Sequence, residues 1–114
     1  MSGIEVFVRP EEDQWTATDP GVRRRVLAHD AGLMMVEFAF DRGAEGLLHS
    51  HPHIQASYVA RGRFEVTVDG RTETLETGQS FIVPSGARHG VRALEDGLLV
   101  DCFTPAREDF LGPR

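Results

Sequence analysis

Potential metal ligands alternate along one short stretch in the middle of this chain of 114 residues. They are His49, His51, His53 and Gln55. Alternate side chains of a β-strand lie on the same face, so these side chains point one way if the strand is regular. Imidazoles that are clustered away from water lose hydration and repel one another when protonated, so they need a partner. A divalent ion is such a partner, and the stretch therefore predicts a metal site on a β-strand.

A second element lies further along the chain and ends in another histidine. It consists of Gly78, five residues, Pro84-Ser85-Gly86, two residues and then His89. A solvated, histidine-rich strand edge would account for the first stretch alone, and it gives no reason for this second element. The two elements together favour a metal site over a solvated edge.

These spacings resemble the two signature motifs of the cupin superfamily, G(X)5HXH(X)3-4E(X)6G and G(X)5PXG(X)2H(X)3N. In the first motif, five residues separate Gly43 from His49 and six separate Gln55 from Gly62. Two positions depart from the motifs, because Gln55 stands where Glu is usual and Ala93 stands where Asn is usual. The resemblance implies an all-β fold, the double-stranded β-helix of the cupin jelly-roll barrel.

Strand signals dominate the chain after residue 21. Apolar and β-branched runs bounded by turn residues predict strands at Val22–His29, Leu33–Phe40, Val59–Val68, Arg71–Leu75, Ser80–Val83 and Leu98–Phe103. Asp69-Gly70 is a two-residue hairpin signal, and Glu108–Leu111 is able to form a helical turn. Many short strands joined by glycine-rich turns indicate a sandwich or a barrel, in agreement with the jelly roll.

The length and composition predict one domain over residues 1–114, with 40% hydrophobic residues available for its core. Within it we expect an N-terminal edge strand and loop over residues 1–21, the barrel over 22–104 and a C-terminal turn over 105–114. Ile4–Val8 alternates as an edge strand does. Because an open jelly roll leaves edges that pairing would cover, we expect a homodimer.

The charge pattern argues against a nucleic-acid partner. The formal net charge is −6, and all 12 basic residues are Arg. Phosphate binding relies on clustered Lys and Arg, and the only dense basic run is Arg23-Arg24-Arg25. We interpret this run as the exposed start of a strand.

The single cysteine and the N-terminus bear on the compartment. Cys102 has no second cysteine to pair with, so a reducing cytoplasm is expected, and a buried, inert thiol is favoured over a nucleophile. Residues 1–5 contain no basic and apolar export signal, and no stretch is apolar for long enough to span a bilayer. A membrane partner is not expected.

The ligand types determine the character of the predicted metal. Three histidines and one glutamine carry no formal negative charge, so the bound ion keeps its full charge as a Lewis acid. Such a site accepts Zn, Ni, Mn, Fe or Co, and affinity order alone does not choose among them. His53 is left with two roles, because a fourth inward histidine crowds one ion: it is a ligand, or it supports the ligands or lines the pocket.

The C-terminal segment, Leu99 to Phe110, resembles the DxFxPxRxD(F/Y) ending of KdgF-like cupins, which are uronate-ketonising enzymes of pectin and alginate breakdown. Leu33–Phe38 and His49–Gln55 are similar to the same group, in which the ligand after the two histidines is also Gln. The resemblance covers Val22 to Leu111. It implies that the chain opens a 4,5-unsaturated monouronate ring to a linear 4-deoxy-5-keto product.

The same resemblance implies roles for individual residues, carried over position by position. His49, His51, Gln55 and His89 would hold one divalent metal. Asp101 would be the acid or base, Phe103 would shape the sugar pocket and Arg107 would clamp the anionic substrate's carboxylate, as its planar fork allows. We add His53 and Tyr58 as candidate substrate contacts.

Ordinary structural roles remain open for these residues. Asp101 could be a solvated strand-end carboxylate, Phe103 a core residue and Arg107 a surface partner of Glu108 or Asp109. Ile54 stands where such cupins commonly have Glu. The alternative functions are an Fe(II)-dependent dioxygenase, another small-molecule metalloenzyme, or a non-catalytic binder of a sugar acid or metal.

Overall fold

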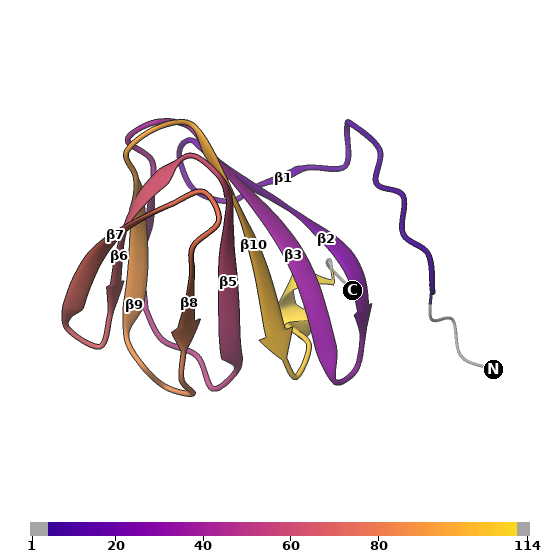
Figure 1. Cartoon of the computed structure of the whole chain (residues 1–114). Helices are drawn as coiled ribbons and strands as arrows, with labels where there is room; N and C mark the ends of the chain where they lie inside the picture. The colour runs from indigo at the N-terminus through magenta and orange to yellow at the C-terminus, as the bar shows by residue number, and fades with distance from the viewer. Residues whose placement is uncertain (1–4, 112–114) are drawn as a thin grey trace.

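The computed structural model describes residues 5–111, which form two antiparallel sheets facing each other. The larger sheet has the order β1-β2-β3-β10-β5-β8 and the smaller has the order β4-β9-β6-β7 (Figure 1). The strands are β1 Thr16–Ala17, β2 Val22–Asp30, β3 Leu33–Phe40, β4 Glu45–His49, β5 Ile54–Arg61, β6 Arg63–Val68, β7 Arg71–Glu76, β8 Ser80–Val83, β9 His89–Ala93 and β10 Gly97–Thr104. This arrangement confirms the predicted all-β jelly roll.

Alternation of apolar residues explains why the predicted strands form. Along β3, Met34 and Val36 are fully buried, and Leu33 and Met35 on the alternate positions are exposed. The predicted bounds of β3 and β8 agree with the structure, and β2, β7 and β10 extend by a residue at one or both ends. Asp69 and Gly70 both have positive φ, 52° and 82°, which is the geometry of a type I′ turn between β6 and β7.

The predicted strand Val59–Val68 is wrong, because the chain breaks at Gly62 and changes sheet there. Gly62 has φ +91°, a conformation that L side chains rarely adopt. A Cβ at this position would lie 2.6 Å from the backbone oxygen of Asp96. Only glycine allows the chain to leave β5 in one sheet and enter β6 in the other.

The prediction of one regular strand from His49 to Gln55 is also wrong. β4 ends at His49, residues 50–53 cross between the sheets, and β5 begins at Ile54. The proline at position 52 cannot donate to a ladder, which is consistent with the break. The side chains of this stretch therefore do not share one strand face, and each must be placed separately.

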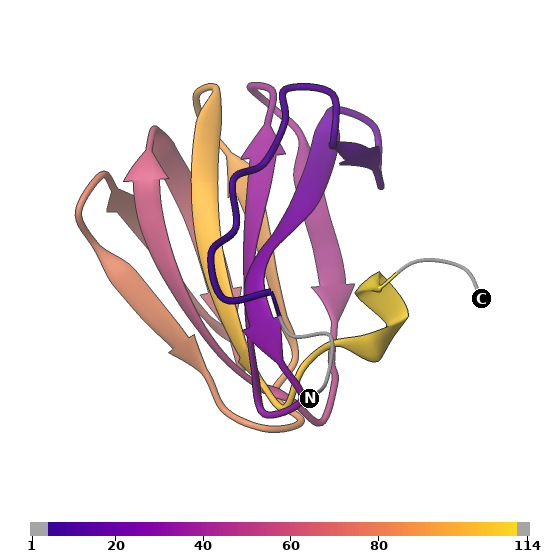
Figure 2. The same cartoon turned by 90° about the vertical axis from the view of Figure 1, so that its right-hand side faces the viewer.

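The predicted N-terminal edge strand is not formed by residues 5–8, and Ile4 lies outside the described residues. β1 instead lies in the segment expected to be a loop, where Thr16 pairs with Arg24. Figure 2 shows the indigo N-terminal segment running alongside β2, and Arg25 Nη1 donates to the Glu11 carbonyl there at 3.1 Å.

The core consists of two apolar clusters. The larger lies between the two sheets, and its buried members are Val22, Phe40, Val59, Phe64, Val66, Ala93 and Leu99. The smaller joins Met34, Val36, Phe103 and Ala106, with Phe110 packed against it. The second cluster fixes the C-terminal turn η1, Glu108–Phe110, against β3 and β10.

The helical turn expected at Glu108–Leu111 is this short 3-10 turn, which ends one residue earlier. Within residues 5–111, none of the helical structure is both long enough and apolar enough to cross a membrane.

Substitution Gly62→Ala is expected to lower the free energy of unfolding by about 3 kcal/mol, because the methyl group meets the Asp96 carbonyl and φ is unfavourable. Urea unfolding followed by circular dichroism measures the change. Gly32→Ala is the control, since the nearest atom to its added Cβ is 3.8 Å away. Equal stability of the two variants would contradict the importance of the Gly62 break.

Candidate metal centre and adjoining cavity

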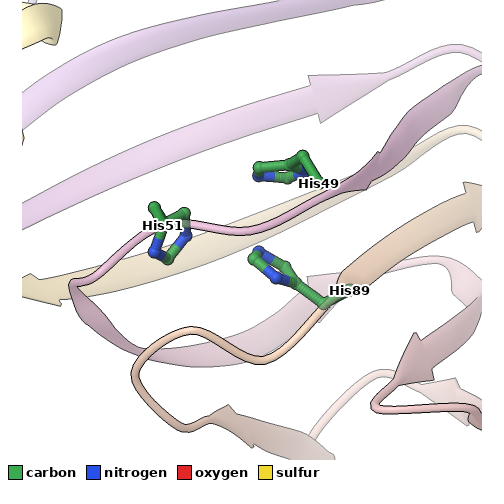
Figure 3. A group of neighbouring side chains, drawn as sticks. All are labelled: His49, His51 and His89. Atoms are coloured by element: carbon green, nitrogen blue, oxygen red, sulfur yellow. The ribbon is translucent and has the colours of Figure 1, made fainter.

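Three histidines from three segments converge between the sheets (Figure 3). His49 ends β4, His51 lies in the crossing segment and His89 begins β9. One ring nitrogen from each lies within 4.8 Å of the others. The ring centroids of His49 and His89 are 4.3 Å apart, and those of His51 and His89 are 4.7 Å apart. Such spacing allows all three to bind one ion.

Backbone carbonyls orient each of these rings. Nδ1 lies 2.8 Å from the Leu47 carbonyl in His49, 3.0 Å from the His53 carbonyl in His51, and 3.0 Å from the Ala87 carbonyl in His89. A carbonyl at Nδ1 selects the tautomer in which Nδ1 carries the proton. The lone pair is then on Nε2, which is the arrangement of a metal ligand with its supporting hydrogen bond.

The chemistry of the rings fits a divalent ion. His89 Nε2 is buried without a hydrogen-bond partner among residues 5–111. His51 faces an oxygen acceptor at both nitrogens, because Gln55 Oε1 lies 3.0 Å from its Nε2. A neutral imidazole has one proton and cannot donate to both. An ion between Nε2 and Oε1 would resolve this conflict.

Burial favours the neutral, ligating form of the histidines. Desolvation, opposed by the hydrogen bond to the Ala87 carbonyl and aided by the charges of His49 and His51, lowers the pKa of His89 to about 4. Desolvation likewise lowers the pKa of His51, although the hydrogen bond with Gln55 opposes the shift. Both rings are therefore unprotonated near neutral pH and available to a metal.

Gln55 connects the histidines to a buried carboxylate. It is buried, and its Nε2 donates to Ser57 Oγ at 2.9 Å and to Asp101 Oδ2 at 3.3 Å. Its Oε1 is left facing the histidine cluster. A glutamate here could not donate to Asp101, so the change from the usual Glu has a physical reason in this chain.

Asp101 lies in the interior and is not the solvated strand-end carboxylate considered from the sequence. It is 5% exposed, and its Oδ1 has no hydrogen-bond partner among residues 5–111. Burial raises the pKa of Asp101 to about 7, while the Ser57 hydroxyl and the Arg107 charge act in the opposite direction. Such a carboxyl group can both take and give a proton near neutral pH.

A cavity of about 320 Å³ adjoins the histidines. Six of the predicted site residues line it: His49, Gln55, His89, Asp101, Phe103 and Arg107. The lining residues do not include His51, whose ring centroid lies 5.7 Å from that of Phe103, which lines the cavity. The fold thus brings residues from β4, β5, β9, β10 and the C-terminal turn to one space.

His53 lies beside the three-histidine cluster and not within it. Its ring centroid is 5.5 Å from that of His51 and 6.5 Å from that of Phe103. Its Nδ1 is buried without a hydrogen-bond partner among residues 5–111. This position favours the supporting role, since its carbonyl already orients the His51 ring.

The position of Tyr58 corrects its predicted place in the substrate pocket. Tyr58 is 48% exposed and lies on the outer face of β5, opposite to Gln55 and Ser57. The residues that line the cavity do not include it. Its parity in the strand, one residue after Ser57, is the physical reason.

Sequence reasoning missed three residues of the site: Arg24, Ser57 and Phe110. The run Arg23–Arg25 was interpreted as exposed, but Arg24 is half-buried and lines the cavity. The alternation of Val22, Arg24 and Val26 was the available signal for an inward Arg24. Ser57 carried no comparable signal, because a buried hydroxyl is common in any core. Phe110 is the last position of the C-terminal motif, and that motif was its signal.

Cys102 has the predicted parity, opposite to Asp101 and Phe103, but it is partly exposed on the outer face and not fully buried. Desolvation raises the pKa of its thiol, and the neighbouring Asp101 raises it further. The thiol is therefore protonated and a poor nucleophile, as expected.

Residues 36–101 match the cupin domain family. This chain belongs to the cupin family. It is 40% identical over 103 residues to the pectin degradation protein KdgF of Dickeya dadantii (strain 3937), covering 89% of this chain and 94% of the relative. The match confirms the resemblance to KdgF-like cupins that the sequence motifs indicated.

Solved cupin structures agree with this placement. The structure of KdgF from Halomonas sp. is 41% identical with a TM-score of 0.87, over 92% of this chain and 97% of that chain. An RmlC-like cupin from Shewanella frigidimarina NCIMB 400 is 43% identical with a TM-score of 0.89, over 93% of this chain and 96% of that chain.

Substitution His89→Ala is expected to weaken divalent metal binding by this cupin about 100-fold or more, because it removes a buried ligand nitrogen. Metal per chain after dialysis against Zn²⁺ or Ni²⁺ is measured by mass spectrometry. His29→Ala is the control, because His29 Nδ1 makes a similar contact with the Leu27 carbonyl outside the cluster. Equal metal content in both variants would contradict the site.

Substitution Asp101→Asn is expected to stabilise the metal-free protein above pH 7. The native pKa of Asp101, about 7, exceeds the usual value, so the folded state holds the extra proton at acid pH and stability falls as pH rises from 4 to 7. The neutral amide avoids this loss, on the order of 2–4 kcal/mol, and the gain vanishes near pH 4. The free energy of unfolding in urea is measured at pH 4 and pH 8. Asp13→Asn, at an exposed position, is the control. A variant that is no more stable than wild type at pH 8 would contradict it.

Proposed function

We propose that this cupin opens and ketonises 4,5-unsaturated monouronates, in the breakdown of pectin or alginate. The product is the linear 4-deoxy-5-keto sugar acid. The curated relative is a pectin degradation protein of nearly the same length. The observation that carries the proposal is the buried carboxyl of Asp101, joined through Gln55 to the histidine cluster and facing the same cavity.

Asp101 is the proposed acid and base. As a base it takes the proton of the anomeric hydroxyl, the bond between the anomeric carbon and the ring oxygen breaks, and the aldehyde forms. The ring oxygen is then an enolate oxygen on C5. Asp101 delivers to C4 the proton that it took, and the ketone forms at C5, so the whole conversion is an isomerisation in which no atom is lost. A pKa of about 7 lets Asp101 serve both proton steps.

The proposed metal ligands are His49, His51, Gln55 and His89, with one divalent ion that is Zn, Ni, Mn, Fe or Co. When bound, the ion would supply a Lewis acid that favours negative charge on a sugar oxygen. Gln55 contacts His51 of the proposed ligand set and also Asp101. Negative charge on a sugar oxygen at the ion would therefore lie close to Asp101. His53 is proposed to support His51 and not to bind the ion.

Aromatic and cationic residues are proposed to hold the anionic sugar. Arg107 lies over the Phe103 ring at 5.1 Å and over the Phe110 ring at 4.2 Å, and its side chain is 14% exposed. Phe103 is buried beside His51. A sugar lying along Phe103 would meet Asp101 at one edge and positive charge at the other.

Further expectations also stand as proposals. We infer one cupin domain over the whole chain, a cytoplasmic location and a homodimer. The lone Cys102 supports a reducing compartment. Exposed apolar side chains on the outer face of the larger sheet, Met35, Tyr58 and Ile82 among them, support pairing of two copies. The net charge of −6 argues against a nucleic-acid partner. Arg24 and Arg107 line the cavity and suit a small anionic sugar.

Metal-loaded protein is expected to accelerate the loss of the ultraviolet absorbance of unsaturated galacturonate or mannuronate at least 100-fold over the spontaneous rate. Asp101→Asn should lose most of this acceleration, by about 100-fold, because the amide cannot transfer the proton. Tyr58→Phe, on the outer face, is the control that should keep the wild-type rate.

The outcome distinguishes the alternatives. An unaccelerated reaction with fully metallated protein would contradict ketonisation. Oxygen uptake with Fe(II) would then point to a dioxygenase, and binding of the sugar acid without turnover would point to a non-catalytic binder. Acceleration that persists in Asp101→Asn would remove Asp101 from the mechanism and keep the function.

A further inference from the structure

We propose that Arg24 supplies the hydrogen bonds that bind the substrate's carboxylate, with Arg107 as a second positive charge held in place by Asp109. The inference rests on the proposed function and names the specificity-determining residue of the same cavity. It departs from the sequence motif, in which Arg107 alone would clamp the carboxylate.

One of the two bidentate edges of Arg107 is already occupied. Its Nε donates to Asp109 Oδ1 at 3.1 Å and its Nη2 donates to Asp109 Oδ2 at 3.0 Å. The Nε/Nη2 edge is therefore paired with a carboxylate inside the protein, which leaves only the Nη1/Nη2 end of this side chain for a ligand. Arg107 still contributes charge to the cavity, since it lowers the pKa of Asp101.

Arg24 lines the same cavity as Arg107 and, in the part of the chain that the structure describes, has no carboxylate hydrogen-bonded to its guanidinium. It lies in β2 opposite Phe38, and both side chains line the cavity. Its guanidinium carbon is 4.0 Å from the Phe110 ring centroid, next to Arg107 at 4.2 Å from the same ring. Stacking on the ring face leaves the N–H edge of a guanidinium free to donate.

Arg24 differs from both of its neighbours, because Arg23 and Arg25 each face a carboxylate. Arg25 Nε forms an ion pair with Glu37 at 2.8 Å, and Arg23 lies 3.6 Å from Asp41. Within residues 5–111, neither an ion pair nor a hydrogen bond occupies the Arg24 guanidinium. Two guanidiniums on one ring repel each other, and Asp109 alone does not neutralise both. An anion bound in the cavity would neutralise the remaining positive charge of the two guanidiniums.

The aromatic residues set the distance between the two ends of the cavity. Phe103 lies between the metal-binding histidines and Phe110, with centroids 5.7 Å from His51 and 5.7 Å from Phe110. In an unsaturated uronate, the anomeric carbon and the carboxylate-bearing carbon flank the ring oxygen. A sugar on Phe103 would thus direct its anomeric end to Asp101 and its carboxylate to Arg24.

The test compares Arg24→Met and Arg24→Lys with Arg23→Met, using the unsaturated monouronate and its neutral carboxamide. Losing charge-assisted hydrogen bonds is expected to raise KM for the acid about 10-fold to 100-fold, with a smaller change in kcat. The preference for the acid over the carboxamide should fall by the same factor. Arg24→Lys should recover part of it, and Arg23→Met should stay within about twofold of wild type.

The proposal is overturned if Arg24→Met keeps the wild-type KM and acid preference, or if it lowers kcat alone for both substrates. Metal content and melting temperature establish that each variant folds. If wild-type protein does not ketonise the substrate, the affinities for galacturonate and for galactose, measured by calorimetry, still test whether Arg24 binds the carboxylate. Wild type should then prefer the acid and Arg24→Met should not, whereas equal preference would reject Arg24.

Discussion

The pairing of β4 with β9 is the constraint on which the site depends. His49 and His89 are partners across this antiparallel ladder, so residues from distant parts of the chain meet on a rigid frame. The two backbones approach so closely that a Cβ on Gly90 would lie 2.8 Å from the Gly46 carbonyl oxygen. Ligands held by a sheet in this way keep their geometry before any metal arrives, which a loop would not ensure.

The interior of the site holds polar groups that the folded chain does not satisfy by itself. Among residues 5–111, His89 Nε2 and Asp101 Oδ1 are buried without hydrogen-bond partners, and each such group costs about 1–3 kcal/mol. Functional sites commonly retain such groups at the expense of stability. Gln55 contacts His51 through its Oε1 and donates to the other oxygen of Asp101, Oδ2, so the histidine cluster and the carboxyl group are physically connected.

Much of the fold followed from alternation and turn chemistry. β3 and β8 were located to the residue, and the Asp69-Gly70 hairpin formed as expected, because local sterics decide these features. Two errors, at Gly62 and between His49 and Gln55, fell where the chain changes sheet. Val59 before Gly62 and Phe64 after it are buried in the same core cluster, although their strands belong to different sheets. Apolar residues therefore report burial and not which sheet a strand joins.

By itself the sequence determined the family, the jelly roll and the residues available to hold a metal, since spacing and residue type express those properties directly. Only the tertiary structure decided which of them meet. It placed His53 beside the three-histidine cluster, left Tyr58 outside the cavity and brought Arg24 to the cavity. It also paired Arg107 with Asp109. The reason is that a side chain's partners depend on sheet pairing and on the packing of distant segments, and neither property is local in the chain.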